Sequence, residues 1–158
     1  MKKQWHKTFL KIVDIISEHS TCARAQVGAV LVKDTRIISI GYNGVPSGIK
    51  PHCNEIFDSE HLNNLSADHP ERQKHTTWQQ ANEIHAEINA IGYAARNGIA
   101  TEGTTMYIPM TPCQDCCKAM IAAGIKQIVY PKGNEYKEQE GLKLLKKAGV
   151  KLVAFEDK

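Results

Sequence analysis

Strand and helix patterns alternate along the C-terminal two-thirds of the chain, and this alternation limits the possible folds more than any other feature. Strands separated by helices pair in parallel, whereas the two strands around "KDT" form an antiparallel hairpin. The pattern therefore predicts an α/β domain of three layers, α/β/α, with a five-stranded mixed sheet. The predicted elements are helix 4–20, strands 26–32 and 36–42, helix 82–98, strand 104–111, helix 113–124, strand 126–130, helix 138–149 and strand 150–155.

The size and composition favour one domain, residues 1–158, in a reducing compartment. Five cysteines, without an apolar leader at the N-terminus, indicate a cytoplasmic protein whose clustered cysteines bind metal or do redox chemistry. The longest apolar runs are far too short to cross a membrane. A net charge of +3 and 6% aromatic residues argue against a polynucleotide partner, which needs a basic stripe or stacking platforms.

The segment from Val45 to about Gln80 shows no sustained periodicity, yet it carries four of the seven histidines. These four are His52, His61, His69 and His75. We expect an insert of this length to be functional or disordered. Any single one of its histidines is more often solvated than bound to a metal.

Three cysteines, Cys113, Cys116 and Cys117, lie within five positions where a strand gives way to a helix. The i, i+3 spacing of Cys113 and Cys116 places both sulfurs on one side of the first turn, next to backbone N–H groups that stabilise thiolates. Cys117 is not excluded by spacing, because i and i+4 share a face equally well. Cys-x-x-Cys after a strand is also typical of thiol redox proteins, so metal and redox chemistry both remain open.

A histidine and a carboxylate at the start of another helix favour the metal. His85 and Glu87 reach one point only at a helix's first turn. With two thiolates they would form a Cys₂His zinc site whose fourth position holds a water of pKa about 7. Glu87 would then be a proton shuttle. The alternative is a closed structural zinc with Glu87 as the fourth ligand.

The paired motifs "HAE" and "PCQDC" are similar to the signature of the zinc deaminases. Two longer stretches, "TCARAQVGAVLVKDTRIISIGYNGVPSG" and "HAEINAI", resemble the deoxycytidylate (dCMP) deaminases within that superfamily. The resemblance covers nearly the whole chain and implies the cytidine deaminase fold. It also implies the zinc-dependent conversion of dCMP to dUMP and ammonia, in which activated water attacks C4 of cytosine. Glu87 would carry the water's proton to N3 and later protonate the departing amine.

The same resemblance assigns substrate contacts to this chain. Asn43 would meet the sugar and base, and the backbone at Ala86 would orient the pyrimidine. Arg24 and Tyr136 would meet the 5′-phosphate, for which a guanidinium offers paired donors. The plainer alternatives are a surface charge for Arg24 and a packed aromatic for Tyr136.

Regulation is implied by the resemblance alone. In most members dCTP activates and dTTP inhibits, at a second nucleotide site built around the loop that matches Gly41, Tyr42, Asn43 and Gly44. Mg²⁺ often accompanies the effector, and the assembly is often a homo-oligomer, a hexamer. The produced dUMP would supply thymidylate synthesis.

A second, structural zinc is implied by resemblance to the bacteriophage-type members. Its ligands would be Cys22, Cys53, His75 and Glu83, although Cys53 matches only after a shift of one residue, with His52 in the unshifted place. The alternative is two free buried thiols and two solvated side chains.

Two rival functions fit the motifs less well. A deaminase of tRNA or single-stranded DNA should carry more charge and more aromatic residues. A non-catalytic zinc module or a thiol redox module would leave Glu87 without a role.

Overall fold

A single mixed sheet organises the chain in this computed structural model, which describes residues 2–135 and 140–157. The strand order is β2-β1-β3-β4-β5: β1 pairs antiparallel with β2 and β3, and β3, β4 and β5 pair in parallel. The sequence prediction of a five-stranded mixed sheet is confirmed. The strands are β1 (Gly28–Lys33), β2 (Arg36–Tyr42), β3 (Thr105–Tyr107), β4 (Gln127–Pro131) and β5 (Lys151–Phe155). The helices are α1 (Lys3–Ser17), α2 (Cys53–Ile56), α3 (Ser59–Asn64), α4 (Pro70–Asn82), α5 (Ala86–Arg96), α6 (Gln114–Ala122) and α7 (Glu140–Lys147).

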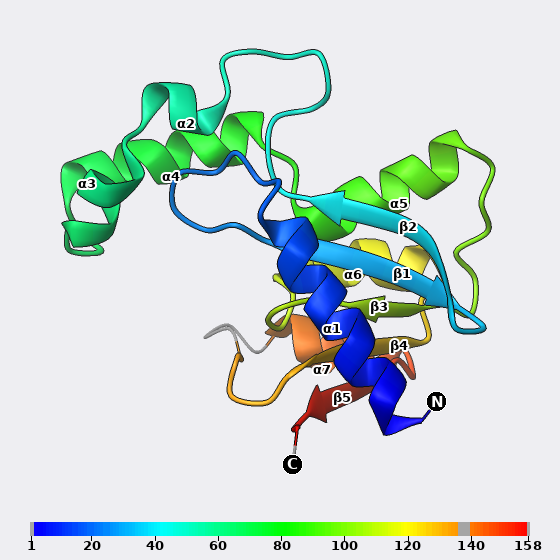
Figure 1. Cartoon of the computed structure of the whole chain (residues 1–158). Coiled ribbons are helices and arrows are strands. Elements are labelled where there is room, and N and C mark those ends of the chain that lie inside the picture. The colour runs from blue at the N-terminus through cyan, green and yellow to red at the C-terminus, as the bar shows by residue number, and fades with distance from the viewer. Residues whose placement is uncertain (1, 136–139, 158) are drawn as a thin grey trace.

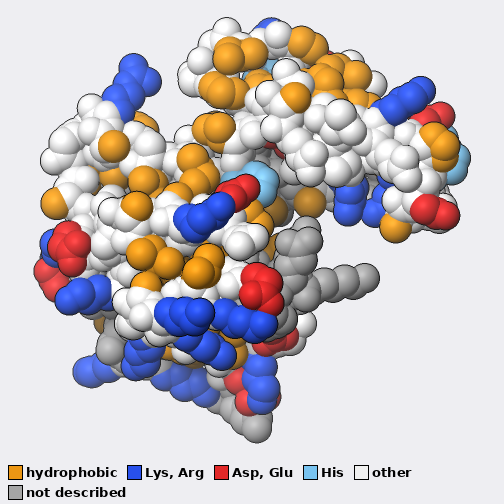
Figure 2. All heavy atoms as spheres, turned by 180° about the vertical axis from the view of Figure 1, so that it is seen from behind, with side chains coloured by type: hydrophobic (Ala, Val, Ile, Leu, Met, Phe, Trp, Pro, Cys, Tyr) orange, Lys and Arg blue, Asp and Glu red, His pale blue; other side chains and the backbone are white. Residues whose placement is uncertain are grey.

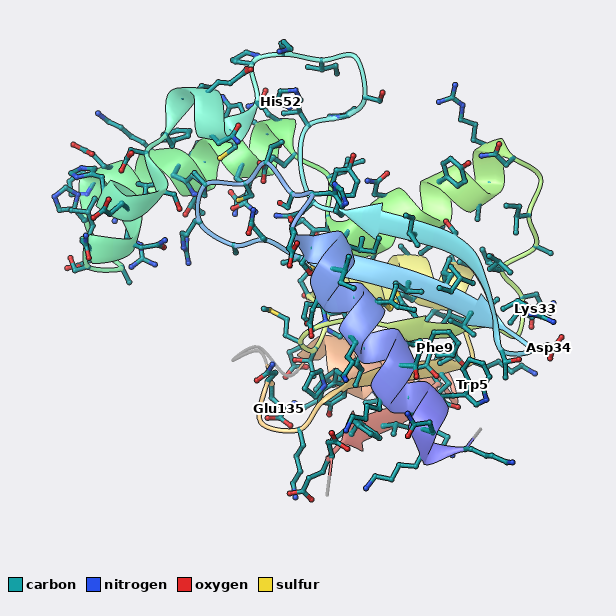
Figure 3. All side chains as sticks on the ribbon, in the orientation of Figure 1. Trp5, Phe9, Lys33, Asp34, His52 and Glu135 are labelled. Carbon is teal, nitrogen blue, oxygen red and sulfur yellow. The ribbon has the colours of Figure 1, made fainter. Side chains whose placement is uncertain are left out.

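Helix α1 covers one face of the sheet (Figure 1). Its buried side chains Phe9, Leu10 and Val13 pack on Val30 and Tyr107, which point to that face. Trp5 stacks on Phe9 at 5.4 Å between ring centroids, and both lie along the same side of the helix (Figure 3). The apolar residues whose spacing predicted this helix therefore lie on the face that it buries.

Helices α5, α6 and α7 cover the opposite face, which completes the three layers. The larger core lies here, around Leu31, Met106, Ile128 and Leu145. β2 approaches α5 so closely that a Cβ at Gly41 would lie 2.3 Å from the carbonyl oxygen of Ala86. Glycine at this position thus permits the close packing that brings the start of α5 against the sheet.

The two largest errors in the predicted boundaries lie beside the cysteine and histidine motifs. The helix predicted from residue 82 starts at Ala86, because Ile84 leaves the helical path and pairs with Gly44 in an isolated bridge. The strand predicted over 104–111 ends at Tyr107, since Pro109 and Pro112 cannot donate to a ladder. The chain beyond Tyr107 is then free to carry Cys113 to the start of α6.

The segment 45–80 is folded into helices, although its sequence shows no sustained periodicity. It contains α2, α3 and α4, which form a lobe beside the sheet (Figure 1). Its helices were missed because their buried faces carry few apolar residues: the one fully buried side chain of α4 is His75. The lobe has a small core of its own. Its members are Cys22, Ala23, Cys53 and Leu62, with Phe57, Leu65 and Trp78 packed against them.

Among the described residues, none of the helices combines the length and the apolar character that a membrane crossing requires.

Candidate active site

His85, Cys113 and Cys116 come together where α5 and α6 begin. The Sγ atoms of Cys113 and Cys116 each lie 3.4 Å from Nδ1 of His85. One candidate ligand atom from each residue lies within 4.8 Å of the other two. His85 is exposed, Cys113 is half-buried and Cys116 is buried, so the group has a side open to solvent. We call it the cleft cluster.

Helix caps place two of these side chains. His85 is the N-cap of α5 and Cys113 is the N-cap of α6, both with extended backbone. An N-cap side chain projects beyond the helix start, next to the free N–H groups of the first turn. His85 is also tied to the sheet, because Gly44 and Ile84 exchange two backbone hydrogen bonds of 3.2 and 2.9 Å. The bridge therefore fixes the start of α5 next to the end of β2.

The electrostatics of the cleft cluster favour a thiolate even without a metal. A hydrogen bond from the Cys116 thiol, with a further contribution from His85, lowers the pKa of Cys113 to about 4. The same contact raises the pKa of Cys116. The Cys113 sulfur raises the pKa of His85. One histidine and two cysteines of this kind are the donors that Zn²⁺ prefers, so the residues fit a zinc ion with a fourth position left for another ligand.

Glu87 lies in the first turn of α5 and is 6% exposed. Burial raises the pKa of its carboxyl group, and the nearby His85 and the Cys116 thiol oppose that rise. A carboxyl with a raised pKa takes up a proton more readily than an ordinary glutamate, which favours a role in proton transfer. Glu87 is therefore placed beside the cluster in a state that suits proton transfer.

Cys117 lies elsewhere, in the contact between α6 and α7. It is fully buried, its Sγ lies 3.7 Å from the carbonyl oxygen of Pro112, and burial raises its pKa to about 11. A Cβ on Gly141 of α7 would lie 2.7 Å from this sulfur, so the two helices meet tightly here. The structure thus groups Cys113 and Cys116 with His85 and leaves Cys117 in the core.

A cleft of about 690 Å³ opens at the cleft cluster, between the lobe and the sheet. Figure 2 shows the molecule from this side, with a hollow between the lobe and the main body. Of the predicted substrate residues, Arg24, Asn43 and Ala86 line the cleft, and Tyr136 lies outside the described residues. The remaining described lining residues are Ala25, Val27, Thr76, Gln79, Gln80, Glu83, His85, Glu87, Met110, Thr111, Cys113, Gln114 and Asp115.

Three cleft residues of α4 escaped sequence reasoning: Thr76, Gln79 and Gln80. They resemble the polar face of any surface helix, and only their i, i+3, i+4 spacing shows that they share one side. The apolar pattern carried no sign that this side faces a cleft.

The Asn43 side chain connects the segments of the cleft wall by hydrogen bonds. Its Oδ1 accepts from Ser20 Oγ at 2.6 Å and from the Val27 N–H at 2.8 Å, and its Nδ2 donates to the Ala25 carbonyl at 2.8 Å. The neighbouring positions of the predicted effector loop differ in burial and packing. Gly41 is required by packing against α5, and Tyr42 is 40% exposed.

A second group, Cys22, Cys53 and His75, lies in the core of the lobe. Nε2 of His75 is 3.3 Å from Cys53 Sγ and 3.8 Å from Cys22 Sγ. All three are buried, at 4% exposure or less. We call this group the buried cluster. His52, labelled in Figure 3, precedes α2 and is not part of the group, so the structure selects Cys53.

Glu83 lies beside the buried cluster. Burial raises the pKa of its carboxyl group, and the thiols of Cys22 and Cys53 oppose that rise. Neither carboxylate oxygen has a hydrogen-bond partner among the described residues, and the same holds for Nδ1 of His75. Burial also raises the pKa of Cys53 to about 12. Unpartnered buried carboxylate oxygens facing two thiols and an imidazole fit a bound cation, and the donor set fits zinc.

Comparisons with known proteins agree with this geometry. The family model for the cytidine and deoxycytidylate deaminase zinc-binding region matches residues 3–132. The chain is 37% identical to the deoxycytidylate deaminase of Enterobacteria phage T2 over 170 aligned positions, covering 92% of this chain and 89% of that protein. For the phage T4 deoxycytidylate deaminase the identity is 38%, covering 92% and 86%. The crystal structure of cyanophage S-TIM5 dCMP deaminase with dCMP and dUMP superposes with a TM-score of 0.76 at 29% identity, covering 98% of each chain.

Proposed function

The chain belongs to the cytidine and deoxycytidylate deaminase family, and on that premise we propose that it hydrolyses dCMP to dUMP and ammonia. One observation carries the proposal: His85, Cys113 and Cys116 converge in a cleft with the buried carboxyl of Glu87 beside them. The similarity to phage deoxycytidylate deaminases, and to a dCMP deaminase solved with dCMP and dUMP, supports dCMP as the substrate.

His85, Cys113 and Cys116 would hold the catalytic zinc, which supplies an activated water for attack on C4 of cytosine. Glu87 would accept a proton from the water and donate it to N3 of the base. It would then take the second proton from the attacking oxygen and pass it to the departing amine. The raised pKa of the Glu87 carboxyl supports this double role, because such a group takes up a proton more readily than an ordinary glutamate.

The cleft walls would orient the nucleotide. The backbone at Ala86, one residue after His85, would meet the pyrimidine. Asn43 has one amide N–H beyond the bonds found among the described residues, and that donor would reach the sugar or the base. Arg24 would pair with the 5′-phosphate, joined by Tyr136, whose position lies outside the described residues.

The buried cluster would hold a second, structural zinc, with Glu83 as the fourth ligand beside Cys22, Cys53 and His75. A lobe with so small an apolar core supports this proposal, because metal binding contributes folding free energy that the core cannot. Metal analysis of the purified protein should find about two zinc ions per chain.

The remaining proposals rest on resemblance to the family. They are activation by dCTP and inhibition by dTTP at the loop Gly41–Gly44, with Mg²⁺, in a homo-hexamer. A cytoplasmic location and the supply of dUMP for thymidylate synthesis belong with them.

The test is a comparison of substrates. Ammonia release should be fastest from dCMP when cytidine, dCMP, dCTP and an RNA hairpin are assayed side by side. Preference for the hairpin would replace the proposal with a tRNA-type deaminase, and no release from any of them would leave a metal or redox module.

A single substitution sharpens that test. Arg24→Ala should raise the KM for dCMP about 10- to 160-fold, since losing a charge-assisted hydrogen bond costs about 1.5–3 kcal/mol. It should barely change any activity on deoxycytidine, which has no phosphate. Equal damage to both substrates would remove Arg24 from the phosphate site.

A further inference from the structure

Arg24 lies between the buried cluster and the cleft. It lines the cleft together with Glu87, and it follows Cys22 by two residues in a stretch that forms neither helix nor strand. A long side chain on an irregular loop needs fixed points, because ordering it costs conformational entropy. The contacts around Arg24 show where those points are.

The first fixed point is the Cys53 sulfur of the buried cluster. The backbone N–H of Ala23 donates to Cys53 Sγ at 3.2 Å. Cys22, two residues before Arg24, is buried beside it at 4% exposure. The backbone directly before Arg24 is therefore held by a hydrogen bond to the buried cluster.

The second fixed point is α4. Nη1 of Arg24 lies 3.4 Å from Oγ1 of Thr76, which follows the cluster residue His75 directly. The Thr76 hydroxyl donates to the Arg72 carbonyl at 2.9 Å, so its lone pairs face the guanidinium. Because His75 fixes the turn of α4 that carries Thr76, the buried cluster sets both ends of the Arg24 side chain.

We propose that the buried cluster, together with Thr76, positions Arg24 for the phosphate of the nucleotide, so that the second metal site controls phosphate recognition as well as stability. This inference rests on the proposed function, which assigns the phosphate to Arg24. The cluster residues are positioning residues, because they act on the ligand only through Arg24.

The test measures discrimination in equilibrium binding rather than turnover. The dissociation constants of dUMP and of deoxyuridine are measured by calorimetry, and their ratio reports phosphate recognition alone. Thr76→Val should reduce this ratio about twofold to tenfold, the effect of losing one hydrogen bond. Cys53→Ser should reduce it at least as much, and metal analysis should still find the catalytic zinc. Arg24→Ala sets the limit that the other variants approach.

The matched control is Leu62→Ala, in the same small core but without a ligand atom. Leu62 is 2% exposed, so its truncation should lower the melting temperature as a cavity does. It should leave the ratio of dissociation constants unchanged. If Cys53→Ser does not yield folded protein, the ratio of dissociation constants is measured on the wild type after a chelator has removed the metal ion of the buried cluster.

Each outcome decides between two claims. If the wild type binds dUMP no more tightly than deoxyuridine, the proposed function fails. If Arg24→Ala abolishes discrimination but Thr76→Val and the loss of the buried metal leave it intact, only this inference is overturned. A loss of discrimination in Leu62→Ala equal to that in Cys53→Ser would also overturn it, since general loosening of the lobe would then explain both.

Discussion

The cleft cluster and the buried cluster contain the same types of ligand, and the short stretch 83–85 connects them. The cleft cluster joins His85, Cys113 and Cys116 at two helix starts and stays open to solvent. The buried cluster joins Cys22, Cys53 and His75 inside the lobe, with Glu83 beside the two thiols. An imidazole and two thiols are common to both.

The comparison shows that access, rather than ligand type, separates the two roles. A zinc site with an open position can hold and activate water, whereas a site enclosed by four protein groups has no position left for water. Each cluster has a glutamate within two residues of His85, and both glutamates line the cleft, but Glu87 lies beside His85 and the Cys116 thiol whereas Glu83 lies beside the thiols of Cys22 and Cys53. Substitution of a glutamate or a thiol should therefore have different effects in the two clusters.

The largest difference should separate the two glutamates. Glu87→Gln should lower kcat about 10²- to 10⁴-fold and keep both zinc ions, because it removes a proton carrier and not a ligand. Glu83→Gln should keep ammonia release but weaken retention of the second zinc. Parallel ammonia assays and metal analyses measure both. Zinc loss in Glu87→Gln would make Glu87 a ligand.

Removing one thiol from each cluster should damage different properties. Cys116→Ala should lose the catalytic zinc and the activity while the lobe remains folded. Cys53→Ala should keep the catalytic zinc, and its melting temperature should fall by about 2–4 °C for each kcal/mol of stability lost with the metal. Limited proteolysis should then cut between α2 and α4. A melting temperature equal to that of the wild type would contradict a structural metal.

Thiol reactivity should separate the clusters in the metal-free protein. Cys113, with a pKa of about 4, is a thiolate throughout the neutral range, so iodoacetamide should alkylate it at a rate independent of pH from about 6 to 8. Cys53, with a pKa of about 12, stays protonated and buried, so it should react only after unfolding. Mass spectrometry of timed samples assigns the sites. Early labelling of Cys53 would show that the lobe opens without its metal.

The smallest effect should come from Cys117, which belongs to neither cluster. Cys117→Ala should keep both zinc ions and full activity and cost about 1 kcal/mol from the space left between α6 and α7. Thermal unfolding should then shift by about 2–4 °C. Loss of zinc from this variant would reverse the assignment of Cys116 and Cys117.

The sheet layers could be predicted from the sequence because their strands and helices carry strong apolar periods. The strand 36–42 was predicted with the bounds that the structure has. The start of α5 was not, because Ile84 is held by Gly44, a tertiary partner that no local pattern reveals. Short-range spacing likewise placed Cys113 beside a second cysteine, but it left Cys116 and Cys117 both open, and only the packing of Cys117 in the core separates them.

The lobe could not be predicted in the same way. Its helices bury Cys53, Leu62 and His75, a mixture without an apolar stripe. Cys22 and Cys53 lie far apart in the sequence, so only resemblance to known proteins suggested that they meet. Thr76 was missed because a polar residue on a helix gives no sign of facing a cleft instead of water.

The short link Glu83–Ile84–His85 has a consequence for how such chains can change length during evolution. Its two ends serve different clusters, and its middle is paired with Gly44 at the end of β2. An inserted or deleted residue here would turn one glutamate or the histidine away from its cluster, whichever end stayed in place. Gaps in an alignment of related chains should therefore gather in the turns between α2, α3 and α4 and avoid positions 83–87.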